Sequence, residues 1–335
     1  MKRNRVKYGF SLSIVILLGL LLISTAMAKE SKTIKVRVGT ILPRDDHGSY
    51  PALKFMELVT QRTKGQVQFE YFTDSVLGGT RDMYENLLTG GLEMVNGHSG
   101  PFAAWSKKWS FSDIPYVFRD MEHVYKSLLQ GPVGKKLMEG PEIKKAGFRV
   151  ITWLDSGFRV MLTKNKPINS IDDMKGVKFR SPQIKTYMET IRSLGALPTP
   201  IAKAEVYNAL KSGIVDGFEL PASAALKNKD YEAVNFLAVT NHIYAAGLLM
   251  TSEKFFQGLP SDVQRIMMEA GREALEYQKN LPPAEEAAIK ELEKLGLKVT
   301  RPDLEPFREK VRAFQESYAK EIGAYDLLEE ARGIK

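Results

Sequence analysis

The chain has 335 residues, no cysteine, and a formal net charge of +8 from 48 basic and 40 acidic side chains. The absence of cysteine excludes disulfides, thiol catalysis and zinc–thiolate sites. A chain of this length can bury enough apolar surface to fold without cross-links. Acidic and basic residues are interleaved, and no basic run suggests a nucleic-acid-binding surface.

The first 28 residues have the three parts of a secretory signal peptide. Four basic residues lie within the first seven, an apolar run covers 10–23, and Ala26-Met27-Ala28 supplies small residues for cleavage. We expect cleavage after Ala28 and a periplasmic mature protein. An uncleaved membrane anchor is the alternative, but the apolar run is short for a span. The four bases of this segment leave +4 of the formal charge to the mature chain.

The next part of the chain alternates between predicted strands and helices. Apolar residues recur with period two over 34–41 and with helical spacing over 49–63. The further predicted elements before residue 100 are a strand over 66–72, a helix over 81–88 and a strand over 92–96. This alternation is typical of an α/β fold with a largely parallel sheet.

The rest of the chain continues the same mixture. We predict strands over 158–164, 177–181, 214–218, 244–251 and 297–300, and helices over 183–193, 204–212, 261–281 and 284–295, followed by C-terminal helices.

The length favours two lobes over one. We expect lobe I to contain 29–156 plus about 245–283, and lobe II to contain 157–244 plus about 284–335. Because the chain crosses between the lobes more than once, a hinge should connect them. Each lobe should have a central β-sheet flanked by helices.

Two arginines in the second predicted lobe suggest the capture of an anion. Arg159 lies within an apolar predicted strand, and Arg180 ends another strand just before Pro182. A guanidinium among core residues is unfavourable unless its planar fork finds acceptors, and a carboxylate offers two parallel hydrogen bonds. The alternatives are structural ion pairs: Arg180 with Asp172, Asp173 or Glu219, and Arg159 with Asp216 or Glu219.

The order of motifs in this region resembles a known family. Between residues 157 and 221 stand G-x-R, a PI turn, D-x-x-G-x-K-x-R, P-x-P, E-V-Y-x-A-L and V-D-G-x-E-x-P, and weaker matches lie at 77–82, 113–115 and 240–244. The chain is similar to the solute-binding subunits of TRAP transporters of the DctP type. This resemblance implies a two-lobed fold of the periplasmic-binding-protein kind. It also implies a small organic-acid ligand, membrane transporter subunits as partners, and no cofactor.

The resemblance also implies roles for individual residues. Arg180 matches the arginine that grips the ligand carboxylate, and Arg159 matches the second arginine of the site. The chain departs from the family at Lys203, where many members have an aromatic residue, and at Leu220, where many have asparagine. We expect Lys203 to bind a second anionic group, unless it extends to solvent, and Leu220 to form an apolar wall. The further candidates are Tyr207 and Trp153 as cleft-lining aromatics, together with Phe158 and Tyr187, and His47 and Ser49 in the loop after the first strand. Core packing is the alternative for each aromatic, and ordinary hydrogen bonding in a turn or at the surface is the alternative for His47.

No catalytic or metal-binding signature accompanies these residues. The chain has no H-E-x-x-H, P-loop or G-x-G-x-x-G motif, and its histidines at 47, 98, 123 and 242 have no metal-ligand spacing. We therefore expect a binding protein without catalytic residues. A sensory protein that presents its ligand to a membrane kinase, and a periplasmic enzyme that acts on carboxylates, remain the alternatives.

Overall fold

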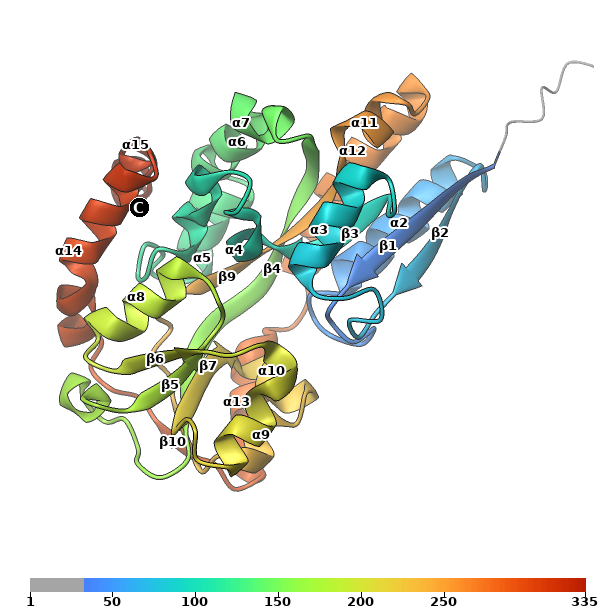
Figure 1. Ribbon diagram of the computed structural model, residues 1–335. Helices are drawn as coiled ribbons and strands as arrows, with labels where there is room; N and C mark the ends of the chain where they lie inside the picture. The colour runs from blue at the N-terminus through green and yellow to red at the C-terminus, as the bar shows by residue number, and fades with distance from the viewer. Residues whose placement is uncertain (1–32) are drawn as a thin grey trace, which may run out of the picture. The chain divides into compact units, whose positions relative to one another are not determined.

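Figure 1 shows the computed structural model of the chain, which describes residues 33–335. The predicted signal peptide lies outside the described residues. Within residues 33–335, no helix combines the length and the apolar character that a membrane span requires.

The strands confirm a mixed α/β fold with a central sheet. Their order is β2-β1-β3-β9-β4-β7-β5-β6, and β8, which pairs with β10, joins this path at β4. The strands are β1 (Ile34–Thr40), β2 (Val67–Phe72), β3 (Met94–His98), β4 (Phe148–Thr163), β5 (Lys178–Ser181), β6 (Leu197–Pro200), β7 (Gly217–Pro221), β8 (Phe236–Ala238), β9 (Tyr244–Ser252) and β10 (Lys298–Thr300).

The helices flank this sheet (Figure 1). In the first half they are α2 (Tyr50–Arg62), α3 (Thr80–Thr89), α4 (Ser99–Phe102), the 3₁₀ helix η1 (Lys107–Asp113), α5 (Met121–Val124), the π-helix η2 (Tyr125–Leu129), α6 (Pro132–Glu139) and α7 (Pro141–Lys145). They continue with η3 (Ile171–Met174), α8 (Lys185–Ser193), η4 (Lys203–Glu205), α9 (Val206–Lys211), α10 (Ala222–Lys227), η5 (Asp230–Ala233), α11 (Glu253–Gln257), α12 (Ser261–Lys279), α13 (Ala284–Lys294), α14 (Glu305–Glu321) and α15 (Tyr325–Gly333).

The expectation of largely parallel sheets is only partly correct. Strand β1 pairs with β3 in parallel, and so do β5 with β6 and β7, and β8 with β10. Strand β9, however, lies between β3 and β4 and is antiparallel to both, and β4 is also antiparallel to β7 and β8. Strands β4 and β9 therefore introduce the antiparallel pairs.

Strand β4 is twice as long as the sequence suggested. Its first part pairs with β9 and its last part pairs with β7 and β8. The irregular register between Asp155 and Phe158 accommodates Gly157, which has a φ of 82°. A Cβ atom there would lie 2.7 Å from the side chain of Glu285, so the position suits only glycine. The predicted strand began at 158 because Asp155, Ser156 and Gly157 read as a loop.

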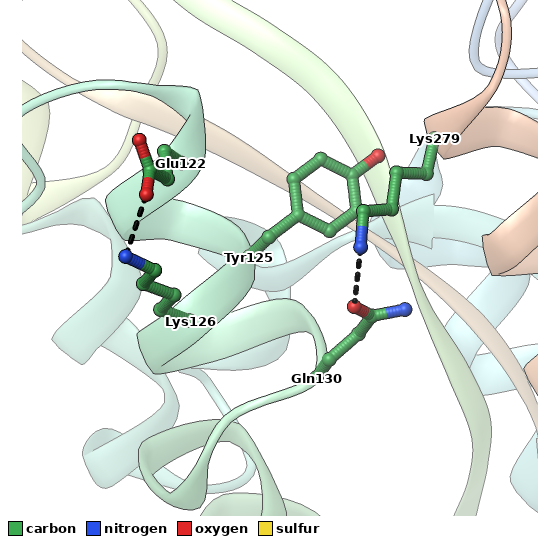
Figure 2. Close-up of a pocket in the computed structure, with 5 residues that line it drawn as sticks. All are labelled: Glu122, Tyr125, Lys126, Gln130 and Lys279. Carbon is green, nitrogen blue, oxygen red and sulfur yellow. Dashed lines mark hydrogen bonds and ion pairs between the residues drawn. The ribbon is translucent and has the colours of Figure 1, made fainter.

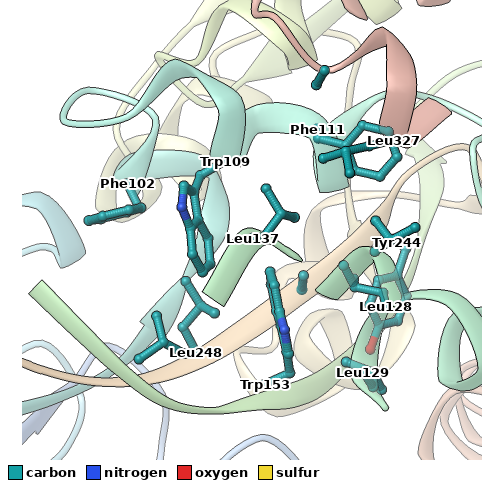
Figure 3. Packing of buried hydrophobic residues seen from close by; sticks show 14 of the residues in the cluster. Phe102, Trp109, Phe111, Leu128, Leu129, Leu137, Trp153, Tyr244, Leu248 and Leu327 are labelled. Carbon is teal, nitrogen blue, oxygen red and sulfur yellow. The ribbon is translucent and has the colours of Figure 1, made fainter. Parts of the chain in front are cut away.

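The largest hydrophobic cluster is built around two tryptophans (Figure 3). The rings of Trp109 and Trp153 stack with centroids 5.0 Å apart, and the ring of Phe102 meets Trp109 edge-on at 5.3 Å. Leu327, from α15, packs in the same cluster. Two smaller clusters take residues from the C-terminal part of β4, with Leu162 in one and Met161 in the other.

The position of α15 bears on the lobe limits that we predicted. We assigned 284–335 to lobe II, but Leu327, Leu328 and Ala331 pack with first-lobe residues of the tryptophan cluster. Helix α13 packs instead with α10, and its Ile289 belongs to the cluster of Leu162. We therefore propose that α13 belongs to lobe II and that α15 belongs to lobe I.

Candidate functional site

Arg159 is held by a carboxylate from the neighbouring strand. It lies on β4 opposite Pro221 of β7, and its Nε and Nη2 donate to the two carboxylate oxygens of Glu219. Nη2 also donates to the Glu219 backbone carbonyl at 2.7 Å. Burial alone would raise the pKa of Glu219, but the Arg159 guanidinium and His242 together outweigh burial and hold the pKa below its usual value. The structural ion pair that the sequence left open is therefore present.

His242 and Tyr187 complete the surroundings of this pair. The His242 Nε2 lies 3.3 Å from a Glu219 carboxylate oxygen, and its Nδ1 lies 2.8 Å from the Thr240 hydroxyl. The Arg159 guanidinium lies over the Tyr187 ring, 4.8 Å from its centroid. Helix α8 carries Tyr187, so the second arginine of the predicted site is fixed by β7, the loop before β9, and α8.

Arg180 has far fewer partners. It lies at the end of β5, is only 6% exposed, and among residues 33–335 its guanidinium makes one hydrogen bond, from Nε to the Ile201 carbonyl at 2.9 Å. Burial lowers the pKa of Arg180 to about 10, with Glu219 opposing the shift and Arg159 adding to it. Asp173, one of its predicted alternative partners, pairs with Lys166 instead. A guanidinium has five N–H donors, so Arg180 remains a nearly buried cation with donors to offer.

The Lys203 ammonium already pairs with a carboxylate of the protein. Its side chain is 43% exposed, and its Nζ pairs with the carboxylate of the buried Asp230. Burial raises the pKa of Asp230 although Lys203 and Arg180 both oppose the shift. A carboxylate of the protein therefore already pairs with the ammonium, and a second ligand carboxylate at Lys203 remains a proposal.

Leu220 packs among apolar side chains, and Tyr207 lies beside a lysine. Leu220 is buried on β7 and packs in a hydrophobic cluster with Val160 and Phe218. Tyr207 is partly exposed on α9, where Lys211 lies 5.3 Å from its ring. Their predicted contacts with ligand remain a proposal.

Two side chains that we predicted to contact ligand from the first lobe have partners inside the protein. Trp153 is a core residue rather than a cleft-lining aromatic, since its ring stacks on Trp109 and is 1% exposed. The fully buried Ser49 hydroxyl donates to the Pro43 carbonyl and accepts from the Tyr71 hydroxyl. His47 is half-buried, with its Nε2 3.8 Å from an Asp155 carboxylate oxygen. Ser49 and Trp153 thus have partners inside the protein, and the predicted ligand contacts of these two residues and of His47 remain a proposal.

The sequence reasoning missed a buried acid beside this site. Asp113 ends η1 and is 1% exposed, and its Oδ1 accepts from the Ser99 hydroxyl at 3.3 Å and from the Tyr187 hydroxyl at 3.4 Å. Its Oδ2 has no hydrogen-bond partner among the described residues. The signal in the sequence was a carboxylate between Phe111 and Ile114, which are both buried. Burial and the nearby Arg159 cation lower the pKa of His98, at the end of β3, to about 4.

One cavity outside this site offers an anion fewer free donors. Figure 2 shows a cavity of about 480 Å³ lined by Glu122, Tyr125, Lys126, Gln130 and Lys279. Its two lysines are engaged, Lys126 by Glu122 and Lys279 by Gln130 and the Tyr125 ring. Among residues 33–335, no group of three acidic or histidine side chains could hold a metal ion.

The comparisons with known proteins identify the family of the chain. The model of the family described as "Bacterial extracellular solute-binding protein, family 7" (DctP) matches residues 38–321. The 2,3-diketo-L-gulonate-binding periplasmic protein YiaO of Escherichia coli is 30% identical over 86% of this chain and 85% of its own length.

Solved structures resemble the fold closely. A TRAP periplasmic solute-binding protein from Polaromonas sp. JS666, bound to D-erythronate, matches with a TM-score of 0.84 and 30% identity over 90% of this chain and 99% of that one. The sugar-acid-binding protein DctPAm from Advenella mimigardefordensis, in complex with galactonate, matches with a TM-score of 0.84 and 27% identity over 91% of this chain and 99% of that one. The chain therefore belongs to family 7 of the bacterial extracellular solute-binding proteins, the DctP family.

Proposed function

We propose that this protein captures a small organic acid outside the cytoplasm and delivers it to the membrane subunits of a TRAP-type secondary transporter. The observation that carries the proposal is Arg180, a nearly buried guanidinium with one hydrogen bond to the described residues. A carboxylate would use its remaining donors and offset the Arg180 charge. The family is one of solute-binding proteins rather than enzymes.

The preferred ligand should carry one carboxylate and several hydroxyl groups. Asp230 already neutralises Lys203, so the site lacks the free second cation that a dicarboxylate needs. D-erythronate and galactonate, the ligands of the two solved relatives, are both hydroxylated monocarboxylates. The buried polar groups near Arg159, including His242 and Tyr187, can exchange hydrogen bonds with hydroxyls.

Capture should proceed by closure of two lobes about β4 and β9. We place the hinge at the irregular stretch from Asp155 to Phe158, where β4 passes from its pairing with β9 to its pairing with β7. The ligand stabilises the closed form because only that form surrounds it with both lobes. Export should depend on cleavage of the signal peptide near Ala28, which releases a periplasmic protein.

Native mass spectrometry of the exported protein tests this function. We expect a bound acid whose mass corresponds to a hydroxylated monocarboxylate, and we expect Arg180→Ala to lose it. Recovery of the acid unchanged after prolonged incubation would separate a binder from an enzyme. A protein that carries no acid, and that shows no calorimetric heat with D-erythronate, galactonate or 2,3-diketo-L-gulonate, would contradict the proposal.

Replacing Lys203 with methionine should weaken the binding of D-erythronate about fivefold, or roughly 1 kcal/mol. The reason is that the buried Asp230 loses its counter-ion and then competes with the ligand for Arg180. The double variant Lys203→Met/Asp230→Asn should restore most of the affinity, because it removes both charges. Calorimetry that finds the single and double variants equally weak would mean that Lys203 contacts the ligand directly.

A further inference from the structure

Asp113 is a buried carboxyl group that joins η1 to α8. Its Oδ1 receives the Tyr187 hydroxyl of α8, and Tyr187 in turn lies against the Arg159 guanidinium. Its Oδ2 is fully buried and has no hydrogen-bond partner within residues 33–335. A Cβ atom at Gly100 would lie 2.8 Å from this oxygen and 3.0 Å from Ile184, so Oδ2 faces apolar surroundings. Apolar surroundings strongly disfavour the ionised form of a carboxyl group.

With Asp113 ionised, the charges of the site are already balanced before an anion binds. Four groups act on the pKa of Asp113: Arg159 of β4, Glu219 of β7, Tyr187 of α8 and the Ser99 hydroxyl at the start of α4. Asp113 in turn adds to the rise that burial causes in the pKa of Tyr84 of α3, and His98 lies near Arg159. Arg159 and Arg180 supply two positive charges, and Glu219 and an ionised Asp113 supply two negative charges. A bound carboxylate adds a third negative charge to a site in which Arg180, Glu219 and Asp113 are buried.

Protonation of Asp113 is the easiest way to remove the excess charge. Glu219 accepts hydrogen bonds from Arg159 on both oxygens and contacts His242, so its ionised form is stabilised. Within the described part of the chain, Asp113 has two long hydrogen bonds on one oxygen and none on the other. Resting on the proposed function, we infer that Asp113 is a positioning residue of the anion site that takes up a proton when a carboxylate binds.

The affinity for the acid should depend on pH. Burial raises the pKa of Asp113 to about 7, with Arg159 and the hydroxyls of Ser99 and Tyr187 opposing the shift. A bound carboxylate should raise this pKa by about one further unit, because like charges disfavour ionisation. Affinity is then highest at low pH and falls as the free protein loses the proton. Between about pH 6 and 8.5, we expect the Kd to rise roughly five- to tenfold.

Isothermal titration calorimetry with D-erythronate, galactonate and 2,3-diketo-L-gulonate tests the inference. Titrations near pH 7 in two buffers of different ionisation enthalpy count the protons taken up. Wild type should take up about 0.4 proton per bound acid. Asp113→Asn should bind with no proton uptake and with a Kd that does not change over the same pH range. Asp113→Ser, which also removes the carboxyl group, serves if the asparagine variant does not fold.

Glu285 provides a matched control. Burial also raises the pKa of this carboxyl group to about 7, but it bonds to Ser223 and to the Ala222 amide at the start of α10. Glu285→Gln should therefore keep the proton uptake of wild type.

Four outcomes would overturn the inference, and they differ from one another. Wild type that binds an acid with equal heats in both buffers refutes proton uptake and leaves the proposed function intact. Uptake that persists in Asp113→Asn and disappears in His98→Gln assigns the proton to the imidazole. Uptake that disappears in Glu285→Gln assigns it to the neighbourhood of the hinge. Failure to bind any of the three acids refutes the proposed function and the inference with it.

Discussion

Replacing Arg180 with lysine is expected to weaken the binding of D-erythronate by about 30-fold or more, which corresponds to roughly 2–5 kcal/mol. Lysine keeps the positive charge but loses the planar fork, so it cannot make two parallel hydrogen bonds to a carboxylate. The variant also loses the bond from Nε to the Ile201 carbonyl that orients the guanidinium. Titration calorimetry of wild type and variant at one pH measures the change.

Arg149→Lys is the matched control for this experiment. The Arg149 guanidinium also makes two hydrogen bonds to one carboxylate, donating to Glu253 at 2.7 Å and 2.6 Å. It lies near the start of β4, far along the strand from Arg159, and does not belong to the proposed site. It should reduce stability modestly and leave the affinity unchanged. Unaltered affinity in Arg180→Lys, with the fold intact by circular dichroism, would mean that the ligand carboxylate binds elsewhere.

The sequence predicted most elements of the fold because their patterns are local. The helix over Tyr50–Arg62 and the strand over Tyr244–Ser252 lie within two residues of their predicted limits. Strand β4 was predicted too short, because its continuity through Gly157 depends on pairing with β9 and on space beside Glu285, which are distant in sequence. The short helices between residues 99 and 145 were missed because none is long enough to show a clear helical period.

The sequence pointed to the two arginines because each is a charged residue in an unusual, apolar setting. An arginine among apolar residues signals its own need for acceptors, and both Arg159 and Arg180 are indeed buried or nearly so. Pairings could not be predicted in this way, because Lys203 and Asp230 are 27 residues apart and Asp113 and Tyr187 are 74 apart. Trp153 was assigned to the site for a similar reason, since its stacking partner Trp109 comes from a distant 3₁₀ helix. Tertiary packing decides such partners, and a single sequence does not contain that information.

Replacing Glu219 with glutamine should destabilise the fold by about 3–5 kcal/mol, because it leaves the Arg159 charge buried without its counter-ion. Glutamine preserves the volume, so the loss reports the charge and the hydrogen bonds rather than packing. Urea unfolding near pH 7 measures the free energy. Glu253→Gln is the control, since its pair with Arg149 is about one-fifth exposed on each side, and it should lose about 1 kcal/mol or less.

The pH dependence of unfolding separates the charge of Glu219 from its shape. Its pKa is lowered in the folded protein, because Arg159 and His242 together outweigh the effect of burial. Its ionised form therefore contributes stability that is complete above the unfolded pKa of about 4.3 and is lost as pH falls through the folded pKa. The difference between wild type and Glu219→Gln should thus be largest near neutral pH and shrink in acid. A difference that stays constant from neutral pH down to about pH 3 would mean that Glu219 stabilises the site through its shape and hydrogen bonds, and that Arg159 is neutralised by another group.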